Sequence, residues 1–501
     1  MTKRTWSIPG LVAALVAAAG TPHARTEQQA PSREEVARLQ FENGRGHMRR
    51  GNYEEGLKDF RAVAESYPDS AVADNARLEI SRYYLEIADD PVEAVNQAEE
   101  ILKRYPTSDS APYAYLVQGQ VVLQRSRRRD ELEKAVATFD RVPGIYPDAD
   151  AVPSALYLSA EALRLAQRPS DALARYRRIV AAYPTDAIIP KVHIGTAMAL
   201  AASGDQVAAL EEFQLARSVD ASREDADLAL ARATTLFRLY IRPAPAPAFA
   251  YSAKDSPSVR AKDVTGMVVT ASGQGYFATK TAIVPFMPSS AEPPPAAAKP
   301  RGLALDRLGR LVAIDAGSLK GRNAPPVPLA VVQGGVAKPL EDVVTAASFR
   351  NGEWIVASDD DRGIQRFSPA GKHLGAFANV RASRLAINDF DEVAVLDRDA
   401  KAIKLFDEAG KPLGAIAARG SGYELKNPVD LAFDAFGHLY VLERSGILVF
   451  RPGRPGSPFV RAFFEPESSP GALRRAAAFA FDAAGRVYVA DDNAEKIRVY
   501  E

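Results

Sequence analysis

The sequence predicts an α+β multidomain chain, with an N-terminal α-solenoid of helical hairpins followed by a C-terminal β-propeller. Three observations carry this prediction: a helical repeat that ends in Tyr-Pro, a later repeat of short alternating strands, and a Pro/Ala-rich stretch between them. At 501 residues, 47% of them hydrophobic, the chain is long enough for two or more packed units.

The helical repeat is marked by four Tyr-Pro pairs whose prolines lie 38, 41 and 37 residues apart, at Pro68, Pro106, Pro147 and Pro184. Before each proline, a small, an aromatic and an aliphatic residue recur at spacings of four and three, which places them on one helical face. The matching sets are Gly56, Phe60 and Val63; Ala135, Phe139 and Val142; and Ala172, Tyr176 and Ile179. The second unit (Ala94, Ala98, Ile101) lacks the aromatic residue, and a fifth (Ala209, Phe213, Ala216) lacks the proline. Proline ends the helix because it has no N–H and clashes with the preceding turn.

Each of these helices follows another apolar-periodic stretch, such as EEVARLQFENGRGHMRR, so each unit is a helical hairpin. Residues 33–241 resemble the tetratricopeptide repeat (TPR), with Gly44, Gly51, Tyr53, Gly56, Phe60 and Pro68 at that family's helix-contact and turn positions. The longer period and the terminal Tyr-Pro resemble its bacterial envelope members, although the lipid-bearing Cys of one such lipoprotein is missing. About five hairpins are expected, capped by the helix EDADLALARATTLFRLY. RSRRRDE lengthens the third unit's turn, and Pro143-Gly144 is expected to shorten its second helix.

The Pro/Ala-rich stretch IRPAPAPAF marks the domain boundary, because alternating Pro and Ala cannot continue a helix. Residues 242–258 are therefore a linker. Within it, Phe249 to Ala253 are expected to supply an outer strand that closes the last propeller blade.

The second repeat occupies residues 259–501, where GLALDRLGRLVAID, RLAINDFDEVAVLD, DLAFDAFGHLYVLE and AFAFDAAGRVYVAD share a strand–turn–strand pattern. Its turn anchors are 43, 39, 46 and 48 residues apart, at Gly309, Gly352, Asp391, Gly437 and Gly485. The motif resembles the NHL repeat, with turn matches at Asp434, Gly437, Asp482 and Gly485 and third-strand matches at Ile364, Phe367, Ile403, Phe406, Ile497 and Tyr500. A weaker unit at 264–288 brings the count to six blades, with five or seven left open.

The first 24 residues have the order of a secretory signal peptide: Lys3 and Arg4, the apolar run IPGLVAALVAAAG, then small residues. Cleavage after Gly20 or after Ala24 predicts a periplasmic or secreted protein with no integral membrane segment, the alternative being an uncleaved anchor. The absence of Cys excludes disulfides, thiolate catalysis and a lipidated Cys. A formal net charge of zero, from 63 basic and 63 acidic residues, does not favour nucleic acid as a partner.

Candidate chemistry in the second half is sparse, and neither cofactor nor metal is expected. His373 falls in an outer strand and His438 follows a turn glycine, so both are interpreted as surface histidines. Asp359 to Asp361 are either a calcium site or, as favoured here, a solvated turn. The basic run from Arg125 to Asp130 is interpreted as a solvated loop, with an acidic partner as the alternative. The stretch AEPPPAAAKP at 291–300 is expected to be an inter-blade loop.

The two resemblances imply an exported, non-catalytic protein-interaction scaffold of the bacterial envelope. It would bind a partner protein or peptide through the TPR groove, a propeller face or both, as part of an envelope complex. Alternatives are a propeller hydrolase or lyase with a TPR recruitment domain, and a cell-wall or carbohydrate binder. Carrying the TPR groove over to this sequence assigns four candidate partner-binding residues in the first unit: Phe41, Arg45, Met48 and Arg49.

Overall fold

The computed structural model describes residues 31–219, 221–242, 263–287, 292–400, 402–452, 459–464, 468–492 and 496–501. The expected signal peptide and the expected closing strand, Phe249 to Ala253, lie outside these residues. The chain divides into two compact units, residues 1–76 and 77–501, and each is described by itself. No helix among the described residues is long and apolar enough to cross a membrane.

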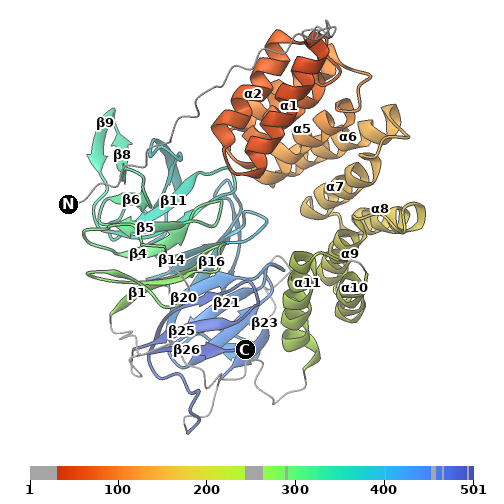
Figure 1. The fold of residues 1–501 in the computed structure, drawn as a ribbon. Coiled ribbons are helices and arrows are strands. Elements are labelled where there is room, and N and C mark those ends of the chain that lie inside the picture. Colours follow the sequence, from red (N-terminus) through yellow and green to blue (C-terminus); the bar gives the residue numbers. More distant parts are fainter. Residues whose placement is uncertain are drawn as a thin grey trace, which may run out of the picture. The chain divides into compact units, whose positions relative to one another are not determined.

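The first half of the chain is entirely helical where the structure describes it (Figure 1), and within each unit consecutive helices pack against each other. The helices are α1 (Arg33–Arg49), α2 (Tyr53–Ser66), α3 (Ala73–Glu86), α4 (Pro91–Arg104), α5 (Ala111–Arg125), α6 (Arg129–Ile145), α7 (Val152–Leu165), α8 (Pro169–Ala182), α9 (Ile189–Ser203), α10 (Gln206–Ser218), α11 (Arg223–Leu236) and the π-turn η1 (Phe237–Ile241). The predicted α-solenoid is confirmed, and α11 with η1 follows its last hairpin.

Side chains fix where several of these helices begin. At α1, Ser32 Oγ accepts a hydrogen bond from the Glu35 amide while the Glu35 carboxylate accepts one from the Ser32 amide, at 3.2 and 2.7 Å. This capping box satisfies two amides that the helix itself leaves unbonded. Asp90, Asp205 and Ser222 accept similar bonds at the starts of α4, α10 and α11.

The recurring Tyr-Pro pair ends the second helix of four hairpins, as the sequence predicts. The tyrosine is the C-terminal cap of α2, α4, α6 and α8, with ψ between 51° and 63° in all four. The following proline forces this conformation because its ring disfavours a helical residue before it. The aromatic positions of the repeat are fully buried: Phe60, Phe139, Tyr176 and Phe213 are 0% exposed.

The prediction that Pro143-Gly144 shortens the third unit's second helix is wrong. Helix α6 continues through Pro143 to Ile145, and the Tyr146 amide donates to the Val142 carbonyl at 2.8 Å. Because Pro143 lies in the last turn, its missing N–H costs the helix one backbone hydrogen bond, and the chain stops at the Tyr-Pro pair in any case.

The second half forms six antiparallel sheets, which are the blades of a β-propeller. Blade 1 is β1 (Val264–Val269), β2 (Gly275–Thr279) and β3 (Ile283–Pro285); blade 2 is β4 (Gly302–Leu305), β5 (Leu311–Asp315), β6 (Ser318–Gly321) and β7 (Val327–Pro328); blade 3 is β10 (Val343–Ser348), β11 (Trp354–Ser358), β12 (Ile364–Phe367) and β13 (His373–Ala378). Blade 4 is β14 (Ala382–Ile387), β15 (Val393–Asp397), β16 (Ala402–Phe406) and β17 (Pro412–Ile416); blade 5 is β20 (Pro428–Phe433), β21 (Leu439–Glu443), β22 (Gly446–Phe450) and β23 (Phe459–Phe463); blade 6 is β24 (Ala476–Phe481), β25 (Val487–Asp491) and β26 (Lys496–Tyr500). Two small ribbons, β8 (Ala330–Gln333) with β9 (Val336–Pro339) and β18 (Arg419–Gly420) with β19 (Tyr423–Glu424), follow blades 2 and 4. Residues 292–300 connect blades 1 and 2 without a strand, as expected.

The Asp-x-x-Gly motif joins the first and second strands of a blade. In blade 5, Asp434 Oδ1 accepts from the amides of Phe436 and His438, both at 2.9 Å, and Gly437 has a positive φ of 78°. Asp306 and Asn388 make the same pair of bonds in blades 2 and 4. In each turn the side-chain oxygen of the first residue accepts from the backbone amides two and four residues later, and these two bonds fix the tight turn. This explains why Asp or Asn recurs at the first position.

The strand-ending acid of the repeat also has a structural role. Asp315 accepts from the amides of Ala298 and Lys299, and Glu443 accepts from those of Lys426 and Asn427, at 2.6 to 3.0 Å. In both blades the carboxylate therefore anchors the segment that leads into the first strand.

The ring closes where blade 1 meets blade 6. Val264, Met267 and Phe277 share one core cluster with Tyr488 and Ile497. In the same cluster, the ring centroids of Phe286 and Tyr488 are 5.4 Å apart. Side-chain packing thus joins the first and last blades among the described strands.

Candidate interaction surfaces

The four candidate residues of the first hairpin lie at different depths in α1. Phe41 is 8% exposed and packs on Phe60, with ring centroids 5.5 Å apart. Met48 is half-buried, and a Cβ added to Gly56 would lie 3.0 Å from its Cγ. Arg45 and Arg49 are exposed one turn apart. Phe41 and Met48 therefore belong to the packing under this surface, whereas the two arginines form it.

Arg45 is held in place on that surface. Its Nη1 donates to Glu42 Oε1 at 3.1 Å, and its guanidinium lies 5.9 Å from the Phe41 ring centroid. Arg38 is also exposed, and the spacing of Arg38, Glu42, Arg45 and Arg49 places all four on one helical face. Arg38 is not among the four predicted residues, although the spacing of four, three and four residues identifies it from the sequence.

Within residues 77–501, the hairpin turns of the solenoid contact the strand-connecting turns of the propeller. Arg127, in the α5–α6 turn, donates from Nε to the carbonyl oxygen of Asp389 in the blade 4 turn, at 2.7 Å. Its Nη1 donates to the Leu123 and Ser126 carbonyls at 2.6 and 2.7 Å. Burial lowers the pKa of Arg127 to about 10. The interpretation of this basic run as a solvated loop is therefore wrong for Arg127, which binds the propeller.

Two phenylalanines at the third position of a blade turn insert into the solenoid. Phe390 of blade 4 packs against Leu132, Leu165 and Ala166. Phe436 of blade 5 meets Phe213 of α10 edge to face, with centroids 6.3 Å apart and an interplanar angle of 81°. An aromatic side chain at the tip of an exposed turn is the sequence signal that could have identified both residues.

Arginines complete this interface by donating to main-chain carbonyls. Arg451 Nη2 donates to the carbonyls of Ala201 and Ala202 in the last turn of α9, at 2.8 and 3.0 Å. Arg461 Nη1 donates to the carbonyls of Arg238 and Arg242 around the end of η1, at 2.8 and 2.9 Å. Carbonyls at a helix C-terminus have no partner in the helix and carry partial negative charge, so a guanidinium stabilises them.

The last helical turn is built into the propeller core. Leu239 is 4% exposed and shares a cluster with Tyr440, Leu442 and Val489 of blades 5 and 6. Neighbouring Tyr240 places its hydroxyl 2.6 Å from His438 Nε2, and His438 Nδ1 lies 2.8 Å from Asp434 Oδ2. His438 is 2% exposed, so its interpretation as a surface histidine is wrong. His438 is buried because η1, which contains Tyr240, covers the blade 5 turn.

His438 occupies a position that is arginine in two other blades. Arg310 and Arg486 follow their turn aspartates by four residues, as His438 follows Asp434, and each donates from Nε to that aspartate, at 2.7 and 2.6 Å. Both arginine side chains are exposed, whereas His438 lies beneath Tyr240. The smaller imidazole keeps the bond to the aspartate and leaves room for the helix.

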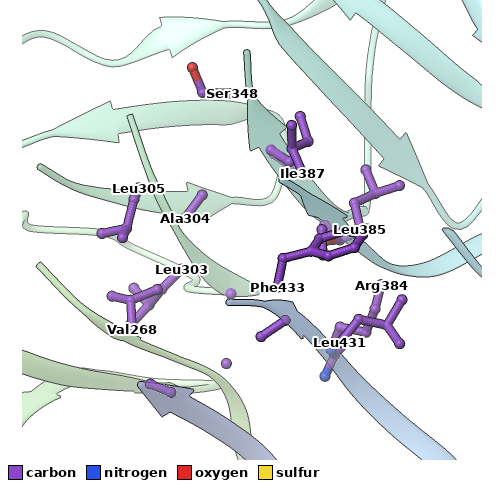
Figure 2. Close-up of a pocket in the computed structure, with 18 of the residues that line it drawn as sticks. Val268, Leu303, Ala304, Leu305, Ser348, Arg384, Leu385, Ile387, Leu431 and Phe433 are labelled. Atoms are coloured by element: carbon purple, nitrogen blue, oxygen red, sulfur yellow. The ribbon is translucent and has the colours of Figure 1, made fainter. Parts of the chain in front are cut away.

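The six inner strands surround a central channel of about 500 Å³. Figure 2 shows Val268, Leu303, Ile387 and Phe433 among the side chains that line it. Arg384 links several blades here: its Nη2 donates to the Thr265 carbonyl of blade 1 at 3.2 Å, and its Nε lies 3.4 Å from Asp430 Oδ1 of blade 5.

Asp430 in turn accepts from the amides of Leu431 and of Phe479 in blade 6, at 3.0 and 3.2 Å. Burial raises the pKa of the Asp430 carboxyl. One ion pair thus links blades 4, 5, 1 and 6 across the channel.

The other titratable side chains considered as metal ligands point to different partners. Asp360 accepts from Arg362 Nε at 2.6 Å, Asp359 pairs with Arg398, and Asp361 is 3.7 Å from Arg381 with its side chain 96% exposed. His373 Nδ1 accepts from the Val332 amide at 3.2 Å. In the described part of the chain, no group of three or more His, Cys, Asp or Glu side chains is arranged to hold a metal ion.

A comparison with protein families gives a match for part of the helical half of the chain. Residues 34–184 match the family model YfiO, described as an outer membrane lipoprotein. No protein of curated function matches the chain.

Solved structures similar to either half are remote. A thermophilic TPR protein of Thermus thermophilus has 15% identity and a TM-score of 0.32, over 40% of this chain and 98% of that one. PilF of Pseudomonas aeruginosa has 16% identity and a TM-score of 0.32, over 41% and 86%. Virginiamycin B lyase of Staphylococcus aureus has 14% identity and a TM-score of 0.34, over 50% and 85%. At these values none assigns a function to this chain.

The repeat period, the Tyr-Pro caps, the family match over 34–184 and the six blades lead to one description. The first half of the chain is a TPR-like α-solenoid, of which residues 34–184 match the YfiO family model, and the second half is a six-bladed β-propeller.

Proposed function

We propose that this chain is an exported, non-catalytic protein-interaction scaffold of the bacterial envelope. The partner binds the exposed face of α1, where Arg38, Arg45 and Arg49 lie with Glu42 on one side of the helix. This row of arginines is the observation that carries the proposal. Export rests on the apolar N-terminal segment of the sequence and on the match of residues 34–184 to an outer membrane lipoprotein family.

The chemistry of this face favours a partner with an acidic segment. Three guanidiniums and one carboxylate give it a net positive charge, and Glu42 neutralises only Arg45. Guanidinium groups bind carboxylates through paired hydrogen bonds, and such bonds are stronger than those between neutral groups. The Phe41 ring beneath Arg45 limits the motion of the guanidinium, so less conformational entropy is lost on binding.

The rest of the solenoid supports a role in protein binding. Its hairpin turns between α5 and η1 already hold a folded protein surface, the propeller turns of the same chain. The TPR half therefore acts as a protein-binding surface within one molecule, and α1 is proposed to extend that role to a separate partner.

The test is charge reversal of the α1 face in the mature, full-length protein. Arg45→Glu combined with Arg49→Glu is expected to abolish capture of the partner from envelope extract, with an unchanged melting temperature and circular dichroism spectrum. The matched control is Lys58→Glu with Arg61→Glu, which reverses two exposed charges on α2 of the same hairpin and should leave capture intact. Capture that survives the α1 reversal would move the binding site away from this face.

A further inference from the structure

A cavity of about 570 Å³ lies between blades 1 and 2, at the turns that join their first and second strands. Its walls come from the blade 1 turn (270–274), the blade 2 turn (306–310), the loop residues 292–295 and the end of β6. This volume is within the range of about 300–1,000 Å³ that is typical of small-molecule sites. None of the contacts between the solenoid and the propeller described above involves a residue that lines this cavity.

The blade 1 turn contributes two small residues to the cavity wall, Ala271 and Ser272. A Cβ added to Gly309 of blade 2 would meet Ala271 of the preceding blade's turn, at 2.6 Å. At the related place in blade 5, a Cβ on Gly437 would meet the ring of Phe390 from blade 4. Ala271 thus lies close against the blade 2 turn, and neither it nor Ser272 adds a large side chain to the cavity wall.

The charges in the cavity wall neutralise each other. Arg310 Nε donates to Asp306 Oδ2 at 2.7 Å, and Arg322 forms an ion pair with Glu292. These two pairs account for all the charged side chains among the described residues that line the cavity. Each charge is offset by its partner, so the wall carries no net charge that would attract an anionic or cationic ligand, and this favours a neutral ligand.

The remaining lining combines hydroxyl and amide groups with apolar surface. Thr270 Oγ1 and Ser272 Oγ lie 2.9 Å apart, and the exposed Asn323 adds an amide with two donors and an acceptor. Pro293, Pro295 and the 42% exposed Leu308 supply apolar surface on the same walls. A sugar ring presents this same combination, with hydroxyl groups around its edge and C–H groups on its faces.

We infer that the cavity between blades 1 and 2 binds a neutral mono- or disaccharide, because its ion pairs are internal and its other polar groups are hydroxyls and amides. The site is separate from the α1 face proposed for the protein partner. A scaffold with this site would bind a glycan and a protein at once.

The test uses the mature full-length protein and calorimetric titration with maltose, N-acetylglucosamine and glucuronate. At least one of the two neutral sugars is expected to bind, and glucuronate is expected to bind more weakly. Ala271→Phe places a ring in the cavity and should weaken binding at least about tenfold, a change of about 1.4 kcal/mol. The control Ala483→Phe makes the same change at the same turn position of blade 6 and should leave binding unchanged.

Asn323→Ala removes one polar group without adding volume, and it should weaken binding while the melting temperature stays the same. This second variant keeps the test decisive if Ala271→Phe disturbs the fold. The inference is overturned if neither neutral sugar binds at millimolar concentration, if glucuronate binds as well as they do, or if Asn323→Ala leaves the affinity unchanged.

Discussion

Replacing Gly44 by Ala is expected to destabilise the first hairpin, although the same change usually stabilises a helix. A Cβ built on Gly44 would lie 2.7 Å from Phe60 Cε1 and 2.9 Å from its Cδ1. Phe60 is fully buried and also packs on Phe41, so its ring has little room to withdraw. Real Cβ atoms do not approach carbon atoms this closely, and the two helices must therefore separate.

The magnitude follows from two opposing terms. Alanine is favoured over glycine in a helix by about 1 kcal/mol. Overpacking a close-packed contact costs about 1–3 kcal/mol. The net change in the free energy of unfolding is thus a loss of roughly 0–2 kcal/mol. Phe60→Ala removes the ring altogether and is expected to cost about 3–5 kcal/mol. In the double variant Gly44→Ala with Phe60→Ala, the methyl group introduced at position 44 partly fills the space that the Phe60 ring leaves. The two changes in the free energy of unfolding should therefore not be additive.

Hydrogen exchange of the α1 and α2 amides in the full-length protein measures this effect locally. The matched control is Gly144→Ala in α6, where nothing lies within 4 Å of an added Cβ. That variant should be neutral or slow exchange in α6, whereas Gly44→Ala should speed it in α1 and α2. If Gly44→Ala instead slows exchange, the assigned helix packing is incorrect.

Three further predictions concern residues 77–501. Phe436→Ala removes the ring that packs on Phe213 of α10 and should speed hydrogen exchange in α10, while Ala435→Ser in the same turn should not. Tyr240→Phe removes the bond to the buried His438 and should lower stability by about 0.5–1.5 kcal/mol in thermal melts; an unchanged melt would show that the bond contributes nothing. Arg384→Met leaves the Asp430 carboxylate buried without its cation and should cost about 3–5 kcal/mol at neutral pH. Burial raises the pKa of Asp430, so protonation at acidic pH should reduce that loss, and a loss independent of pH would contradict this explanation.

The sequence predicted the elements whose signal is local. Tyr67 and the other capping tyrosines precede a proline that can only end the helix, so period and boundary are both visible in the chain. The turn aspartates bond to amides two and four residues ahead, and this short-range chemistry appears as a repeated motif. Both signals can be recognised in the sequence without knowledge of the tertiary packing.

The contacts between the solenoid and the propeller could not be predicted in the same way. Arg127 stands in a run of arginines, and nothing in the run distinguishes the buried guanidinium from its exposed neighbour Arg128. Likewise His438 follows a turn glycine, as an exposed residue would, and only the tertiary position of Tyr240 buries it. Their burial depends on residues far away in sequence.

The candidate site was predicted only in part. The helix period predicts that Arg45 and Arg49 lie one turn apart on α1, and both side chains are exposed in the structure, while their role in binding stays a prediction. The helix period could not show that Phe41, unlike the two arginines, is buried, because its burial results from the contact with Phe60. The saccharide cavity gives no sequence signal of its own, because Ala271 and Asn323 lie in different blades, far apart in the chain.

The contacts of the solenoid with particular propeller blades have a consequence for how this protein can change during evolution. Solenoids ordinarily gain or lose repeats, because each repeat contacts only its neighbours. Here the α5–α6 turn is matched to blade 4 through Arg127, and η1 is matched to blades 5 and 6 through Leu239. A duplicated hairpin between these points would move one of the two contacts out of position by a whole repeat. Residues 127–239 should therefore keep a fixed number of hairpins, while hairpins could still be added before α1.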